Sequence, residues 1–180
     1  NKPHPPMKIE SVTAYRLRVP LTKPYRLSFG PIHAFDTVIV GMRDKDGRSG
    51  LGEATYLTGY TDETIEDSWT LVQSLAGACA GRDMTAVHSA LQPHFTAAPF
   101  TATAFNTALE MLGDHSLLAT ARPTRVPVLG LLHATESADI EREAQQLFDA
   151  GYTTLKVKVG FDARRNAEMV RRVQHVVNGR

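Results

Sequence analysis

The sequence has few of the features that mark secreted, membrane-bound or nucleic-acid-binding proteins. Its 180 residues include one cysteine, Cys79, which has no partner for an intramolecular disulfide. Apolar runs fall well short of the ~20 residues that cross a bilayer, and no leader with a charged and then an apolar part opens the chain. Lys and Arg total 20 against 19 Asp and Glu, so the charge does not favour nucleic acid. These absences predict a cytoplasmic protein with neither a membrane nor a nucleic-acid partner.

The composition is that of a globular protein, with 42% hydrophobic and 22% charged residues. The order of segments over residues 1–122 predicts an α+β domain in which strands precede helices. The strands are expected at 7–19, 37–42 and 50–54, with a loop at 20–31 and a turn at 44–47. The helices are expected at 61–81, 83–91 and 101–119, with Glu63 among the carboxylates at the start of the first. The first part should therefore be a three-stranded antiparallel meander followed by helices.

Residues 123–180 show a different order of predicted elements, in which strands and helices alternate. The apolar run 126–132 is typical of a strand buried on both faces, and a helix capped by Ser137 or Asp139 follows it. A second strand at 153–160 and a second helix at 162–177 complete two parallel βα units. Because two parallel strands cannot cover both of their own faces, we expect the chain to be a piece of a larger fold.

Lys156 and Lys158 are the strongest candidates for chemistry. Two residues apart on a strand, they share one face, which would point inward if the strand belonged to a closed parallel barrel. Each ammonium disfavours the charge of the other, so one amine is expected to lose its proton near neutral pH and act as a base toward carbon. An isolated pattern of this kind is more often a solvated edge strand, and a non-catalytic α+β binding module is the alternative.

Other chemical motifs are weaker. Glu53, at the end of the third strand, is a candidate general base, although a glutamate there is more often a structural hydrogen-bond acceptor. His133 is the histidine that would lie nearest a site at the ends of the parallel strands. The sequence contains no Gly-rich phosphate loop and no serine in a nucleophile elbow.

The succession of these segments resembles the enolase superfamily, and within it the mandelate racemase / muconate lactonizing enzyme group. Two motifs carry the resemblance: GLGEA at residues 50–54 and GYTTLKVKVG at residues 151–160. The second is similar to the second barrel strand of that family. The resemblance implies an α+β capping domain over residues 1–122, followed over 123–180 by the first two βα units of a (β/α) TIM-type barrel.

The resemblance also implies a reaction. Members of this group remove the proton α to a carboxylate, and a Mg²⁺ ion stabilises the resulting enediolate. Lys158 would be the acid/base and Lys156 its electrostatic neighbour, facing the carboxylate of a small-molecule substrate. Tyr25, Phe29 and Tyr60 are expected to contact the substrate from two loops of the capping domain. The implied activity is that of a racemase, an epimerase or a cycloisomerase.

The same resemblance places the metal ligands and the opposing base beyond residue 180, so no residue of this chain is expected to bind the ion. The 180-residue chain alone is therefore expected to be inactive. Barrel enzymes of this type commonly self-associate, so a homo-oligomer is expected. A sugar-acid dehydratase of the same superfamily is the alternative among enzymes, and a His or His–Asp base in the absent part would signal it.

Overall fold

The chain divides into two compact units, Asn1–Ala121 and Arg122–Arg180, in a computed structural model that describes residues 7–27, 30–57 and 59–177. Each unit has its own sheet and its own apolar core. Phe29, one of the three aromatic residues expected to contact substrate, lies outside the described residues.

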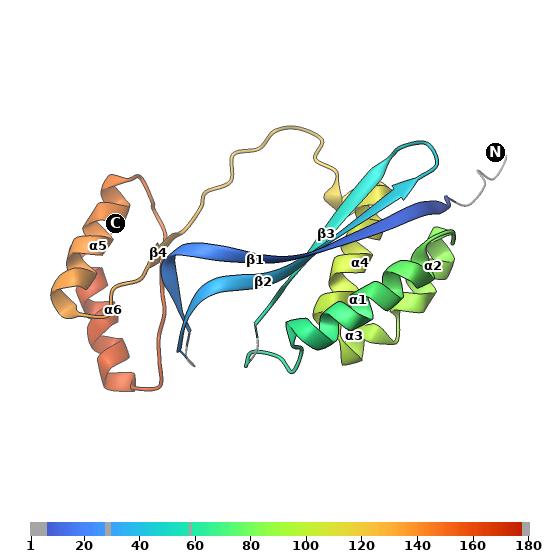
Figure 1. Cartoon of the computed structure of the whole chain (residues 1–180). Coiled ribbons are helices and arrows are strands. Elements are labelled where there is room, and N and C mark those ends of the chain that lie inside the picture. Colours follow the sequence, from blue (N-terminus) through green and yellow to red (C-terminus); the bar gives the residue numbers. More distant parts are fainter. Residues whose placement is uncertain (1–6, 28–29, 58, 178–180) are drawn as a thin grey trace. The chain divides into compact units, whose positions relative to one another are not determined.

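The first unit is built on an antiparallel sheet with the strand order β1-β2-β3 (Figure 1). Its strands are β1 (Ile9–Leu27), β2 (Gly30–Asp44) and β3 (Ser49–Tyr56). The meander predicted from the sequence is therefore confirmed. Strands β1 and β2 pair as far as Leu27 and Gly30, whereas β3 pairs only with residues 36–43 of β2. Beyond β3 the first two strands continue as a two-stranded ribbon.

The loop expected at 20–31 is wrong for the described part of that stretch, because residues 20–27 and 30–31 belong to the two strands of the ribbon. Tyr25 lies in β1 opposite Ile32, and its ring centroid is 6.1 Å from that of Phe35. Pro20 and Pro24 are tolerated in β1 because it is an edge strand, where a missing N–H need not break the ladder. The register of the pair shifts between Pro20 and Tyr25, where these prolines begin.

Four α-helices and a 3-10 turn follow the sheet among the described residues of this unit. They are α1 (Ile65–Cys79), α2 (Met84–Leu91), α3 (His94–Ala97), α4 (Pro99–Leu112) and the turn η1 (Ser116–Leu118). Asp83 caps α2 by accepting a hydrogen bond from the Ala86 N–H. The last helix is shorter than the expected 101–119, because Gly113 caps it and Asp114 has a positive φ of 49°.

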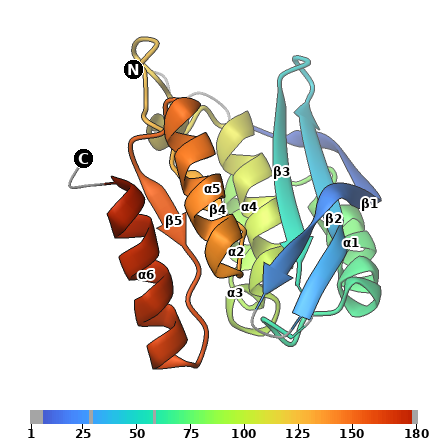
Figure 2. The same ribbon diagram turned by 90° about the vertical axis from the view of Figure 1, so that its left-hand side faces the viewer.

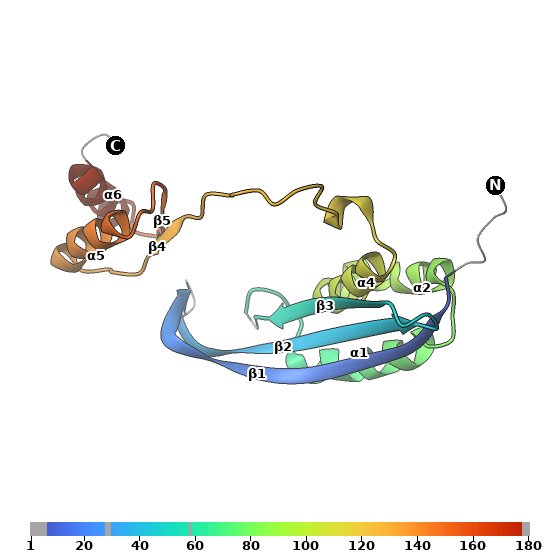
Figure 3. The same ribbon diagram turned by 90° about the horizontal axis from the view of Figure 1, so that it is seen from above.

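Helix α4 packs directly on β3, and two glycines of that strand make this possible (Figure 3). A Cβ atom on Gly50 would lie 2.0 Å from the carbonyl oxygen of Ala108. A Cβ atom on Gly52 would lie 1.8 Å from the carbonyl oxygen of Ala104. The backbone of the helix therefore occupies the space that side chains would need. The core around this contact includes Val38, Val40, Met42, Phe105 and Leu109.

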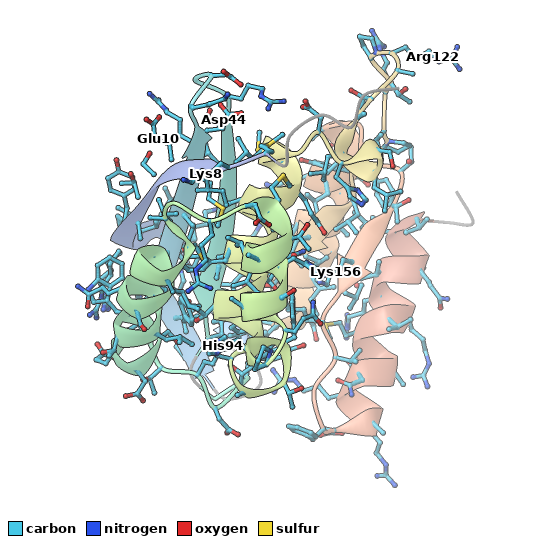
Figure 4. All side chains as sticks on the ribbon, turned by 90° about the vertical axis from the view of Figure 1, so that its right-hand side faces the viewer. Lys8, Glu10, Asp44, His94, Arg122 and Lys156 are labelled. Atoms are coloured by element: carbon cyan, nitrogen blue, oxygen red, sulfur yellow. The ribbon has the colours of Figure 1, made fainter. Side chains whose placement is uncertain are left out.

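The turn between β2 and β3 is held by Asp44, the last residue of β2 (Figure 4). Its buried carboxylate accepts hydrogen bonds from the N–H groups of Asp46 and Arg48, at 3.0 and 2.9 Å. The Arg48 guanidinium adds a hydrogen bond from Nε at 2.8 Å and an ion-pair contact at 2.7 Å. Burial acts to raise the pKa of Asp44, but the hydrogen bonds from Arg48 outweigh it and hold the pKa below its usual 3.8.

This turn predicts a pH-dependent contribution to stability. A carboxyl group whose pKa is lowered by folding stabilises the fold above its unfolded pKa, and the stabilisation is lost as the pH falls through the folded pKa. Asp44→Asn is therefore expected to destabilise the protein at neutral pH, with a deficit that shrinks below pH 3.8. Urea unfolding across this range measures it, with the exposed Asp46→Asn as control. A deficit that stayed constant with pH would contradict this assignment.

The second unit contains two parallel βα units (Figure 2). Its elements are β4 (Gly130–Leu132), α5 (Ser137–Asp149), β5 (Leu155–Val157) and α6 (Ala163–Val177). The predicted order of elements is confirmed, but both strands are shorter than expected. Among the described residues β4 pairs with β5 alone, and this parallel ladder has three residue pairs, from Gly130 opposite Leu155 to Leu132 opposite Val157. Val126 and Val128, which the sequence placed in a buried strand, are exposed.

Helices α5 and α6 cover one face of this small sheet. The core between the layers is made by Leu132, Ile140, Ala144 and Val173, with Leu155 and Val157 packed against it. Within the part of the chain that the structure describes, no helix has both the length and the apolar character that spanning a bilayer requires.

Candidate active site

The two lysines lie where β5 ends. Lys156 is the middle residue of the strand (Figure 4), and Lys158 follows its last residue directly. Because Leu155 and Val157 pack against the helices, Lys156 projects from the opposite face of the strand. Lys156 is exposed and Lys158 is half-buried, while Val159 is 62% exposed.

The face that carries Lys156 is not covered by α5 or α6. Its register partner on β4 is Leu131, which is half-buried. Leu131 therefore lies beside Lys156 on a strand face that neither helix covers. Such a face could pack against further strands of a barrel. That both amines share the inner wall of a barrel stays a prediction.

The connection after β4 is held by a carboxylate from the following helix. Glu143 of α5 accepts hydrogen bonds from the N–H groups of His133 and Ala134, at 2.9 and 2.6 Å. Charged acceptors make stronger hydrogen bonds than neutral ones, so this contact fixes the end of the strand to the helix. The His133 side chain, a weaker candidate from the sequence, is thus carried on an anchored backbone and is exposed.

The connection after β5 is held in a similar way, by Asn166 of α6. Its side-chain oxygen accepts a hydrogen bond from the Gly160 N–H at 3.0 Å, and its Nδ2 donates to the Gly160 carbonyl at 2.8 Å. Sequence reasoning missed this residue. A signal was present, because asparagine is a poor helix former and stands here in the first turn of a helix.

The remaining aromatic candidates belong to the first unit. Tyr60 lies in the connection between β3 and α1, where its N–H donates to the Leu57 carbonyl at 2.9 Å. The side chain of Tyr60 is accessible to a ligand, since the residue is 72% exposed. Tyr25 lies on the β1–β2 ribbon and is half-buried. Both tyrosines are in the first unit and both lysines are in the second.

Both ends of the connection that carries Tyr60 converge on Thr101. The Tyr56 hydroxyl and the Thr101 hydroxyl are 2.8 Å apart, and Thr101 donates to the Glu63 carboxylate at 3.1 Å. Burial raises the pKa of Tyr56, which keeps this hydroxyl protonated. The connection is therefore tethered to helix α4 at its two ends.

The role of Glu63 differs from the one expected. The sequence placed it at the start of α1, but that helix is capped by Thr64, whose hydroxyl accepts from the Asp67 N–H. The buried Glu63 carboxylate instead accepts from the N–H groups of Phe100 and Thr101, at 2.8 and 3.3 Å. It caps α4, whose own N-cap residue, Ala98, has no side-chain oxygen to offer.

Glu53 and Cys79 both have structural roles. Glu53 accepts hydrogen bonds from Thr37 and Thr55, at 3.2 and 3.4 Å, which is the structural role weighed against a catalytic one. Cys79 is fully buried, and this burial raises the pKa of its thiol to about 11. At neutral pH it is therefore a protonated thiol rather than a nucleophile.

A metal ion has no ready ligand set here. Among residues 7–27, 30–57 and 59–177, no group of three or more His, Cys, Asp or Glu side chains is placed to hold one. The residues that the structure describes therefore do not fit the Mg²⁺ ion implied by the resemblance.

Comparisons with known proteins agree on one family. The sequence model for "Mandelate racemase / muconate lactonizing enzyme, N-terminal domain" matches residues 9–132. The chain is 30% identical to the L-Lys-D/L-Arg epimerase of Methylococcus capsulatus, over 97% of this chain and 52% of that protein. It is 24% identical to the N-succinyl-L-Arg/Lys racemase of Bacillus cereus, over 95% of this chain and 49% of that protein.

A solved structure gives the same result. The crystal structure of a dipeptide epimerase from Methylococcus capsulatus, complexed with Mg and the dipeptide L-Arg-D-Lys, matches with a TM-score of 0.81. The identity is 29%, over 97% of this chain and 52% of that one. The chain thus spans about half the length of the curated relatives it matches.

Proposed function

Because the chain belongs to the mandelate racemase / muconate lactonizing enzyme family, we propose that it supplies the capping domain and the first barrel strands of an isomerase. The substrate would be a small carboxylate, and an amino-acid derivative such as a dipeptide is favoured by the names of the two relatives. The reaction would be epimerisation or racemisation at the carbon next to the carboxylate.

The observation that carries this proposal is the placement of Lys158 at the carboxyl end of a parallel strand, two residues after Lys156. In parallel α/β folds this end is where ligands bind, because the connections to the helices form the site there. Lys158 follows the last residue of β5, and Asn166 and Glu143 anchor the two connections at this end. An amine carried on an anchored backbone is suited to proton transfer.

Two lysines have separate tasks in this reaction. The Lys158 amine removes the proton from the α carbon, so that an N–H bond forms while the C–H electron pair moves into the carboxylate as an enediolate. Return of a proton from Lys158 to the same face of the carbon completes the exchange. Inversion needs a proton donated to the opposite face, by the opposing base that we expect in the half of the relatives' length that this chain does not cover. Lys156 keeps a positive charge near the carboxylate, where negative charge accumulates.

Mg²⁺ would supply further positive charge to the enediolate when bound. Since the described residues offer no ligand set, we expect its ligands in the half of the relatives' length that this chain does not cover. The chain alone should then be unable to accelerate the reaction.

Hydrogen–deuterium exchange at the α carbon tests the proposal. Protein expressed from the complete reading frame that contains this sequence is incubated with Mg²⁺ and a dipeptide panel in D2O, and NMR follows the loss of the α-proton signal. The expected result is exchange with at least one dipeptide, and none with residues 1–180 alone.

The other outcomes are equally informative. Loss of water from sugar acids, with no exchange in dipeptides, would identify the dehydratase alternative. A folded, Mg²⁺-supplied protein that exchanged no α-proton in any carboxylate would favour the binding module. Exchange by residues 1–180 alone would contradict the expectation that the ligands lie elsewhere.

A further inference from the structure

Lys158 lies between two fixed points of the backbone. On one side, Val157 is held in the β4–β5 ladder opposite Leu132. On the other side, Gly160 is held by Asn166 through both its N–H and its carbonyl group. Lys158 itself is outside the strand, so the ladder does not hold it directly. The backbone is thus held by hydrogen bonds on both sides of Lys158.

The hold on Gly160 is more restrictive than a single hydrogen bond. A carboxamide that accepts from the N–H and donates to the carbonyl of one residue fixes the orientation of both flanking peptide groups. A glycine at this place would otherwise sample a wide range of backbone angles. Asn166 thus removes the freedom that Gly160 would bring to the segment after Lys158.

Asn166 is itself well anchored. Its N–H donates to the Asp162 carbonyl at 2.9 Å, as part of the first turn of α6. The Asp162 carboxylate caps the same turn by accepting from the N–H groups of Arg164 and Arg165, at 3.0 and 3.1 Å. The connection is therefore bound to a helix end rather than to another mobile segment.

We propose that Asn166 is a positioning residue for Lys158, acting through the backbone of Gly160. The inference rests on the proposed role of Lys158 in proton transfer. Proton transfer to carbon needs the amine and the C–H bond within a narrow range of geometries, and a displacement of ~1 Å can cost about 100-fold in rate. The clamp limits that displacement without touching substrate.

The test uses the protein expressed from the complete reading frame. Asn166→Ala removes both hydrogen bonds and is expected to lower kcat for α-proton exchange by about 10- to 100-fold, with KM within about twofold. One limb of the kcat–pH profile is expected to disappear in Lys158→Ala, which identifies it as the limb due to Lys158. In Asn166→Ala this limb should shift along the pH axis, because the displaced amine lies near different charges. A merely structural role would lower the stability and leave this limb in place.

Gln145→Ala is the matched control. It removes a helix side chain whose amide bonds to Asp149, at 2.8 Å, without touching either connection. It should leave kcat, KM and the pH profile unchanged. Amide hydrogen exchange gives a readout besides activity: peptides covering Gly160 should exchange faster in Asn166→Ala and at the native rate in Gln145→Ala.

Asn166→Asp is a second variant in case the alanine variant folds poorly. It keeps the size of the side chain and the acceptor for the Gly160 N–H, and it loses the donor to the carbonyl. A reduced kcat with a moved limb supports the proposal. A variant of Asn166 that showed faster amide hydrogen exchange at Gly160 but kept the native kcat and an unshifted limb would overturn the positioning role. That result would leave the proposed function intact. Full activity in Lys158→Ala would overturn the proposed function, and with it this role of Asn166.

Discussion

Lys158→Ala is expected to lower α-proton exchange by the complete protein by about 10³-fold, which is within the range for loss of a general acid/base. The amine is the proposed carrier of the proton, and water cannot reach the same geometry in a closed site. Lys158→Arg should be nearly as inactive, because a guanidinium remains charged at all ordinary pH values and cannot accept the proton. The initial rate of deuterium incorporation, followed by NMR, measures both variants.

The control for this experiment is Lys45→Ala. Lys45 is an exposed lysine in the turn between β2 and β3 of the first unit, and its loss removes the same charge while the sequence of the second unit stays unchanged. It should exchange at the native rate. Should Lys158→Arg retain the native rate, the amine would be acting only as a charge, and its role as a base would have to be abandoned.

Gly52→Ala is expected to destabilise the protein by about 3 kcal/mol or more, at the upper end of the usual cost of overpacking. The new Cβ would lie 1.8 Å from the Ala104 carbonyl oxygen, and backbone atoms of a helix cannot turn aside as a side chain would. The whole of α4 would have to move away from β3, with loss of the core between them. Urea unfolding measures the effect, and a protein that no longer folds would be its extreme form.

Gly77→Ala provides the opposite result from the same chemical change. Gly77 is an exposed residue of α1, and a Cβ atom there would meet nothing within 4 Å. Alanine is the better helix former, so this variant should be more stable by about 0.5–1 kcal/mol. Equal effects of the two substitutions would show that the close contact between α4 and β3 does not exist in solution.

Much of the fold could be predicted because it depends on local signals. Thr64 and Asp83 are residue types that favour the start of a helix, and each caps the helix that follows it. The two parallel βα units could be predicted from the hydrophobic periodicity. The sequence allowed the motif GLGEA at residues 50–54 to be recognised, but only the structure shows why glycines are needed there. Nothing within residues 50–54 indicates that a helix some fifty positions later rests on the two glycines.

The errors arose where distant parts of the chain decide the outcome. Prolines at 20–31 suggested a loop, whereas pairing with β2 made the stretch a strand. The carboxylate of Glu63 was assigned to the nearest helix, although it caps one that begins thirty-six residues later. For the candidate site, the sequence could select both lysines by resemblance but not Asn166, since its partner is a backbone group.

The tethering of Tyr56 and Glu63 to Thr101 has a consequence for how substrate preference could diverge among relatives. With both ends of the connection fixed to one hydroxyl, residues between them can be exchanged, added or removed while the flanking strand and helix stay in place. Lengthening such a loop adds only a small entropic cost, since doubling its length costs about 0.6 kcal/mol. Evolution could thus rebuild the exposed tip around Tyr60 without having to stabilise the scaffold anew.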